Sequence, residues 1–194
     1  KGIAGGVGAV WKRYGEISMT PFCERKTTRK GAIGEQIVFR LLEKKGYVVY
    51  RPQTNKAHPF DNLCATANKR TLIIAEIKTK PMRTNYPDTG IDIRHYNDYL
   101  NIKKKYNIPV CLFFVDEDAR EIYGNELDAI SRKVEIVVRG KTIKYPKIEN
   151  GVMGEIIYFP RASMKSVAAI EKNIASEIAA LSTRNEAYCL RGEK

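Results

Sequence analysis

The residues best suited to chemistry lie at the end of one apolar stretch. Residues 72–75 are all apolar, which predicts a central strand covered on both faces, and the chain then changes to alternating residues. Because side chains alternate across a strand, Glu76, Lys78 and Lys80 point to one face. A charge buried there destabilises the fold unless it is paired or bound to a metal. We therefore expect each of these charges to have a partner.

Asp61 is the predicted partner of Glu76. A turn through residues 67–70 would form a hairpin that brings Asp61 alongside the strand. Two neighbouring carboxylates repel each other unless an oxygen-preferring divalent cation lies between them, which favours Mg²⁺, with Mn²⁺ as a substitute. Lys78 is then placed to hold or deprotonate a metal-bound water for in-line attack on a phosphodiester. A surface ion pair is the alternative explanation of this pattern.

Asp61 followed by Glu76-Ile77-Lys78 resembles the signature of the PD-(D/E)XK nuclease superfamily. The resemblance implies a restriction-endonuclease-like fold. It also implies that Asp61 and Glu76 bind the metal together with the carbonyl of Ile77, while Lys78 serves the attacking water. The proline that precedes the aspartate in this family is displaced here to Pro59.

A Gly-x-x-Gly-Glu segment upstream adds to this resemblance. Gly31, Gly34 and Glu35 open a predicted helix, and the small residues there permit a close approach of the backbone. The segment is similar to that of archaeal-type Holliday-junction resolvases and related phage nucleases, which implies that Glu35 reaches the metal cluster, often through water. A solvent-facing helix carboxylate is the alternative for Glu35.

Composition indicates a polyanionic partner. The 194 residues suffice for one domain, and 34 Lys and Arg against 22 Asp and Glu give a formal net charge of +12. This charge attracts nucleic acid, although an anionic membrane surface or a basic surface without a partner also fits it. The 4 cysteines are widely spaced, which argues against a zinc module or a disulfide scaffold and predicts free thiols in a reducing cytosol. No apolar run is long enough to span a membrane.

The order of the predicted elements is that of an α/β protein. Thr27 and Thr28 are expected to cap the first helix, and Gly46 to end it. Residues 116–118 are expected to form an acidic loop rather than a second site. The predicted αβββαβ core, with a mixed central sheet, consists of a helix over 29–45, a strand over 47–51, the hairpin that carries Asp61 and Glu76, a loop over 81–90, a helix over 91–106 and a strand over 110–115.

The rest of the chain is predicted to elaborate this core. It contains a basic hairpin over 132–145, a strand over 155–160 and a helix over 162–181. We expect four parts, namely an N-terminal arm over 1–28, a nuclease core over 29–118, a C-terminal elaboration over 119–184 packed on the core, and a tail over 185–194.

Basic residues outside the metal site are candidates for contacts with nucleic acid. They follow the catalytic strand, lie on the helix over 91–106, or belong to the basic hairpin: Lys80, Arg94, His95, Lys104, Lys105, Arg139 and Lys141. The hairpin residues have a competing explanation as a solubilising edge that discourages strand aggregation.

Together these patterns predict a divalent-metal-dependent nuclease that hydrolyses phosphodiester bonds in DNA, as an endonuclease rather than a processive exonuclease. The metal site fits an RNA endonuclease as well. The fold also fits a non-catalytic nucleic-acid-binding module or a subunit of a larger DNA-processing assembly. Cleavage of both strands of a duplex would suit a homodimer. We expect a cytoplasmic or nucleoid-associated protein with no membrane segment.

Overall fold

A mixed sheet of six strands forms the centre of the structure. The computed structural model describes residues 25–52, 59–66, 68, 70–152 and 154–182. The strands of this sheet lie side by side in the order β1 (Val48–Tyr50), β2 (Asn62–Ala65), β3 (Leu72–Thr79), β5 (Val110–Asp116), β6 (Glu121–Glu126) and β11 (Lys165–Ala169). Strands β3 and β5 are parallel, whereas the other neighbouring pairs are antiparallel. The predicted α/β class with a mixed central sheet is confirmed.

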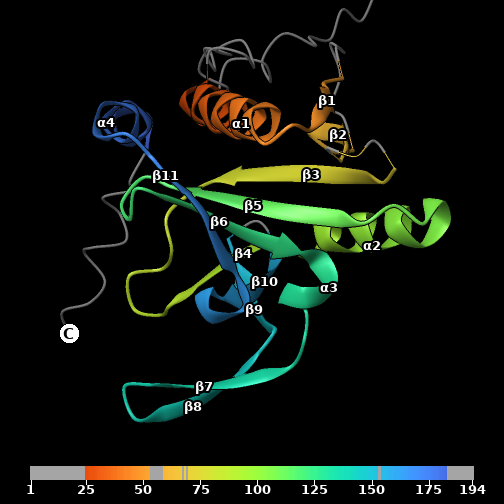
Figure 1. The fold of residues 1–194 in the computed structure, drawn as a ribbon. Helices are drawn as coiled ribbons and strands as arrows, with labels where there is room; N and C mark the ends of the chain where they lie inside the picture. The colour runs from red at the N-terminus through yellow and green to blue at the C-terminus, as the bar shows by residue number, and fades with distance from the viewer. Residues whose placement is uncertain (1–24, 53–58, 67, 69, 153, 183–194) are drawn as a thin grey trace, which may run out of the picture.

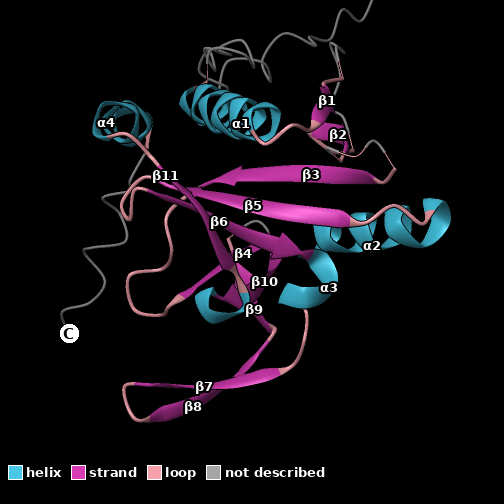
Figure 2. Ribbon diagram, viewed as in Figure 1, coloured by secondary structure: helices cyan, strands magenta, loops and turns pink. Residues whose placement is uncertain are grey.

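Helices and a second sheet cover the two faces of the central sheet. On one face lie α1 (Lys26–Lys44) and α4 (Lys172–Leu181), and on the other lies α2 (Ile93–Tyr106) with the second sheet (Figure 1, Figure 2). The second sheet has the order β4 (Asp88–Asp92), β10 (Gly154–Pro160) and β9 (Lys147–Gly151). The remaining elements are the short helix α3 (Leu127–Ile130), the hairpin of β7 (Val134–Val138) with β8 (Lys141–Tyr145), and a 3₁₀ turn (Arg161–Ser163).

Alternation along β3 and β5 divides the apolar core into two halves. Ile74 and Phe114 pack toward α2 and the second sheet, whereas Ile77 and Phe113 pack toward α1 and α4. Strand β5 is buried on both sides, which explains its continuous apolar run. The same alternation directs Glu76 to the α2 side of the sheet, like Ile74.

The core elements follow one another as predicted, with one insertion. The chain runs α1, β1, β2, β3, α2, β5, but β4 lies between β3 and α2, where the sequence predicted only loop. That prediction was wrong because β4 is stabilised by pairing with β10, with Ile91 opposite Ile157, a partner distant in the sequence. The second helix accordingly begins at Ile93, and the Asp92 side chain caps it by accepting a hydrogen bond of 2.8 Å from the Arg94 N–H.

Helix α1 starts earlier than predicted. Its N-cap is Arg25, without a side-chain cap, and the Arg29 N–H donates to the Arg25 carbonyl at 3.0 Å. Thr27 and Thr28 therefore lie inside the first turn, and the prediction that they cap the helix was wrong. The predicted stop is confirmed, because Gly46 adopts φ 84° immediately after the helix, a conformation that suits glycine.

The C-terminal part differs most from its prediction. The single helix predicted over 162–181 is wrong, since this segment forms most of the 3₁₀ turn, strand β11 and helix α4. Strand β11 is held by backbone pairing with β6, with Ala168 opposite Ile122, and this tertiary pairing overrides the helical spacing of its apolar residues. Strands β6 and β9 were not predicted either, whereas the β7–β8 hairpin and β10 are confirmed.

The predicted arm and tail lie largely outside the described residues, which begin at 25 and end at 182. The division of the chain into four parts stays a prediction. Among the described helices, none has the length and apolar character needed to cross a membrane.

Candidate metal centre and active site

Asp61 and Glu76 lie opposite each other where β2 meets β3. The antiparallel register pairs Asn62 with Ala75. Asp61, the residue before β2, therefore lies opposite Glu76, the residue after Ala75. The Asp61 N–H donates to Glu76 Oε2 at 3.2 Å, and Asp61 Oδ2 accepts from the Ile77 N–H at 2.7 Å. Glu76 is only 3% exposed. The structure therefore brings the two predicted metal-binding carboxylates together in a largely buried position.

The backbone of β3 adds a third oxygen to this corner. The N–H groups of Ile74 and Lys80 donate to the carbonyls of Pro109 and Val115, on the β5 side. The Ile77 N–H donates instead to Asp61, on the β2 side. Within a strand the N–H and C=O of one residue point the same way, so the Ile77 carbonyl also faces the β2 side, beyond the end of β2. Two carboxylates and this carbonyl would form an all-oxygen donor set, the kind that Mg²⁺ or Mn²⁺ prefers.

Lys78 and Tyr99 hold the Glu76 carboxylate. Lys78 Nζ lies 2.5 Å from Glu76 Oε1, and the Tyr99 hydroxyl donates to the same oxygen. Burial and the charge of Glu76 raise the pKa of Tyr99, so its hydroxyl stays a donor. Tyr99 was not among the residues predicted for this site. The only signal was its inward-facing position on the helix, since a buried tyrosine hydroxyl needs a partner.

The electrostatics of Asp61 are those of a crowded acidic site. Burial, and then the charge of Glu76, raise the pKa of Asp61 to about 7, although the hydrogen bond from Ile77 opposes the shift. Ionisation of Asp61 beside the charged Glu76 is unfavourable without a nearby cation. Lys78 supplies part of that positive charge, and a divalent cation would supply more.

Glu35 lies nearby on α1 but is held differently. Its carboxylate is 3.5 Å from Arg51, and burial raises its pKa, with the charge of Glu76 adding to the shift. In the described part of the chain, no three His, Cys, Asp or Glu side chains gather closely enough to hold a metal ion. Glu35 therefore does not complete a preformed site of three carboxylates, and its role as a metal ligand or water-mediated support stays a prediction.

A close contact between α1 and β3 positions Glu35. A Cβ added at Gly34 would overlap Thr79 Oγ1, whereas a Cβ at Gly31 would meet nothing within 4 Å. The close approach predicted from the small residues therefore exists at Gly34 and not at Gly31. Because Thr79 follows Lys78 on the catalytic strand, Gly34 fixes the distance between the helix and this strand.

The seven predicted nucleic-acid contacts fall in three separate places. Lys80 is mostly buried beside the catalytic strand, where its Nζ donates to the Gly90 carbonyl and burial lowers its pKa to about 8. Exposed side chains on α2 form the second group, which consists of Arg94, His95, Lys104 and Lys105. Arg139 and Lys141 form the third group at the turn of the β7–β8 hairpin. Contact of all seven with nucleic acid stays a prediction.

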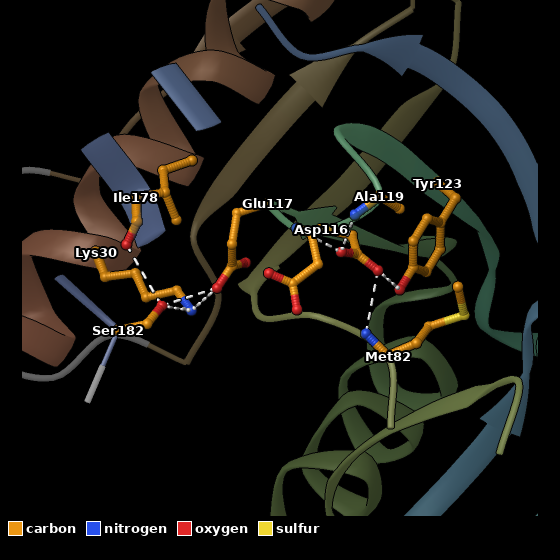
Figure 3. A network of polar contacts seen from close by, with 9 residues as sticks. Lys30, Met82, Asp116, Glu117, Ala119, Tyr123, Ile178 and Ser182 are labelled. Carbon is orange, nitrogen blue, oxygen red and sulfur yellow. Dashed lines mark hydrogen bonds and ion pairs between the residues drawn. The ribbon is translucent and has the colours of Figure 1, made fainter. Parts of the chain in front are cut away.

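A second group of acidic residues ends β5. Asp116 is the last residue of the strand and not part of a loop, which corrects the prediction for this position. Figure 3 shows its carboxylate surrounded by neutral donors, namely the N–H groups of Met82, Asp118 and Ala119 and the hydroxyl of Tyr123. Glu117 points away toward Lys30 at 2.5 Å and Ser182 at 2.8 Å (Figure 3).

The cysteines in the described residues are free, as predicted. Burial raises the pKa of the Cys64 thiol to about 12 and that of Cys111 to about 11, so both are unreactive at neutral pH. Cys23 and Cys189 lie outside the described residues.

Comparison with known proteins gives structural similarity without a match in sequence. No protein-family model and no curated protein matches this sequence. The structure is similar to the 1.6 Å resolution structure of Hjc from Archaeoglobus fulgidus, a Holliday junction resolvase from an archaeal hyperthermophile. The two share 17% sequence identity with a TM-score of 0.40, over 59% of this chain and 86% of that one. The site itself must therefore support any functional assignment.

Proposed function

We propose that the protein is a Mg²⁺-dependent nuclease that hydrolyses phosphodiester bonds in DNA, as an endonuclease. The observation that carries this proposal is the pairing of Asp61 with Glu76 at the end of β2, with Lys78 on the Glu76 carboxylate. Two acids that lie this close together, one buried and one partly buried, are explained by a cation that joins them.

Each site residue has a distinct role in this reaction. Asp61, Glu76 and the carbonyl of Ile77 would hold the cation, which would supply Lewis-acid activation of water and of the phosphate. Tyr99 and Lys78 fix Glu76, and Lys78 holds the attacking water or a phosphate oxygen at its Nζ. Glu35 supports the site from α1, through water or a second ion.

DNA is the proposed substrate because a net charge of +12 favours a long polyanion. We further propose a cytoplasmic or nucleoid-associated protein that cuts duplex DNA as a homodimer or within a larger DNA-processing complex. RNA cleavage by the same metal site, and binding without cleavage, are distinguished by the experiment below.

The test is cleavage of supercoiled plasmid, single-stranded DNA, a four-way junction and RNA, each with Mg²⁺, Mn²⁺ or EDTA. Wild type is compared with Glu76→Gln and Lys78→Met, and with Glu155→Gln as a control of matched chemistry at an exposed position of β10. We expect metal-dependent DNA cleavage that is lost in both site variants and retained in the control.

Two results would contradict the proposal. Preferential cleavage of RNA would assign the same site to a ribonuclease. Failure of wild type to cut any substrate with either metal would indicate a binding module or an absent partner subunit.

A further inference from the structure

A cavity of about 450 Å³ separates the β3–β4 loop from the β7–β8 hairpin. Asn85 and Tyr86 line it from the loop, and Arg139, Lys141 and Lys147 line it from the hairpin and the chain that follows. Figure 1 shows the loop running from the C-terminal end of β3 toward the side where the hairpin turns. The Arg139 Nη2 donates to Asn85 Oδ1 at 3.3 Å, which ties the two walls together. The cavity is thus connected to the candidate catalytic strand by a short stretch of chain.

The cavity is strongly cationic. Three basic side chains line it, and none of the lining side chains in the described part of the chain is a carboxylate. Lys147 is paired with Glu149 at 2.5 Å. Arg139 and Lys141 are exposed and form no ion pair within the described residues. Two uncompensated cations at the mouth of a cavity favour an anionic ligand, and a guanidinium matches the geometry of phosphate oxygens.

The turn of the hairpin has an unusual residue for its conformation. Val138 pairs with Lys141, so the loop consists of Arg139 and Gly140 only, and these adopt φ 51° and φ 76°. Glycine and asparagine favour such positions in a two-residue hairpin loop, whereas arginine is strained there. This strained turn holds Arg139 at the wall of the cavity. Binding of an anion by the guanidinium would offset the free-energy cost of the strain.

Tyr86 gives the cavity an aromatic wall. The Arg83 guanidinium lies 4.6 Å from the centroid of the Tyr86 ring. Arg83 is itself fixed by two hydrogen bonds of 2.6 Å to the buried Asp88. The ring is therefore held in place before any ligand arrives. Aromatic rings beside cationic side chains are how proteins bind unpaired bases, since the ring stacks on the base while the cations bind the phosphate.

We propose that this cavity binds one nucleotide of an unpaired nucleic-acid strand, with the phosphate at Arg139 and Lys141 and the base against Tyr86. The inference rests on the proposed function only in that the substrate is a nucleic acid. It deepens that function by naming the substrate class, namely branched or flapped molecules that present a single-stranded segment near the cut.

The test is binding without cleavage, measured in EDTA by fluorescence anisotropy with a labelled single strand and a blunt duplex of equal length. One variant combines Arg139→Gly with Lys141→Gln, and glycine suits the turn, so the hairpin is retained. A second variant is Tyr86→Leu. Lys144→Gln is the control, because Lys144 lies on the same strand, is 83% exposed and does not line the cavity. Melting temperatures verify that each variant is folded.

We expect the double variant to bind the single strand at least tenfold more weakly. Because one phosphate contact is lost, the slope of log affinity against log salt should become less steep by about 0.7. Tyr86→Leu should weaken the single strand at least fivefold and the duplex less than twofold, and the control should change neither by more than twofold. A double variant that behaves like the control would overturn the proposal. So would a Tyr86→Leu variant that weakens binding of strand and duplex equally.

These outcomes are independent of catalysis. If the plasmid assay shows no cleavage, the binding comparison still reports on the cavity. If the cavity variants bind normally, the metal site is still tested by Glu76→Gln.

Discussion

The two parallel neighbours β3 and β5 both carry buried carboxylates near their C-terminal ends, yet these carboxylates are compensated in opposite ways. Asp116 on β5 accepts hydrogen bonds on both oxygens from backbone N–H groups and from Tyr123. Glu76 on β3 also has donors on both oxygens, since Lys78 and the Tyr99 hydroxyl contact Oε1 and the Asp61 N–H contacts Oε2. Its neighbour Asp61, however, is a second acid, whose pKa is raised by burial and by the charge of Glu76. Asp116 is therefore held by neutral donors, whereas Glu76 and Asp61 lie close together with one lysine, Lys78, beside both.

This difference shows how to separate structural from functional acids. A buried carboxylate that accepts hydrogen bonds from neutral donors, with no second acid whose pKa it raises, is explained by the fold. Two acids that lie this close together require positive charge beyond the lysine that is present, which favours a cationic ligand. Four predictions test this comparison.

The largest expected effect separates the two acids by activity. We expect Glu76→Gln to lower DNA cleavage by about 10³-fold because a ligand of the metal is lost. Asp116→Asn should leave the cleavage rate per folded molecule within about threefold and lower the free energy of unfolding by about 2 kcal/mol, because backbone donors lose a charged acceptor. Cleavage assays and urea unfolding measure the two. An Asp116→Asn protein of normal stability but without activity would break the comparison.

The second prediction concerns Glu117, the neighbour of Asp116. Lys30 Nζ is its cationic partner, and the Glu117 side chain is 2% exposed. Lys30→Met should lower the free energy of unfolding by about 3–5 kcal/mol, since it leaves a buried charge unpaired. The exposed Lys26 on the same helix is the control, and Lys26→Met should change stability by less than about 0.5 kcal/mol. Equal effects of the two substitutions in urea unfolding would show that the Glu117 ion pair has no structural role.

The third prediction uses Lys80, which follows the catalytic strand. Burial lowers its pKa to about 8 from the usual 10.5, so below pH 8 the charged side chain destabilises the folded protein by up to about 3 kcal/mol. Between pH 8 and 10.5 the unfolded chain binds the additional proton, so stability rises with pH in that window. Lys80→Met should therefore be more stable than wild type at pH 7, and the gap should close as pH rises to 10.5.

Chemical unfolding at several pH values measures this gap. The exposed Lys144 provides the control, because Lys144→Met removes an equivalent charge without a buried environment. A gap for Lys80→Met that stays constant from pH 7 to pH 10.5 would contradict the account of Lys80.

The smallest expected effect concerns the contact that aligns α1 with β3. Gly34→Ala should destabilise the protein by about 1–3 kcal/mol, since its Cβ overlaps Thr79 Oγ1. Gly31→Ala should stabilise it by about 0.5–1 kcal/mol, because the added methyl meets open space and alanine favours the helix. Thermal unfolding measures both. A Gly34→Ala protein as stable as Gly31→Ala would show that α1 can move away from the catalytic strand.

Much of the site could be predicted from local sequence. The alternation after residue 75 places Glu76, Lys78 and Lys80 on one face, and a hairpin of the predicted length brings Asp61 opposite Glu76. The hydrogen bond of Tyr99 and the contact of Gly34 with Thr79 could not be predicted from local sequence, because both depend on which helix packs on which strand.

The sequence by itself determined the strand, the alternation and the hairpin, since these follow from the geometry of a few consecutive residues. Only the tertiary structure decided the rest. Strands β4 and β11 exist because β10 and β6 pair with them, and the pairing contributes hydrogen bonds that no local pattern encodes. The tertiary structure likewise separates Asp116, which is surrounded by donors, from Asp61 and Glu76, which face each other, because hydrogen-bond partners are brought together by folding rather than by position in the chain.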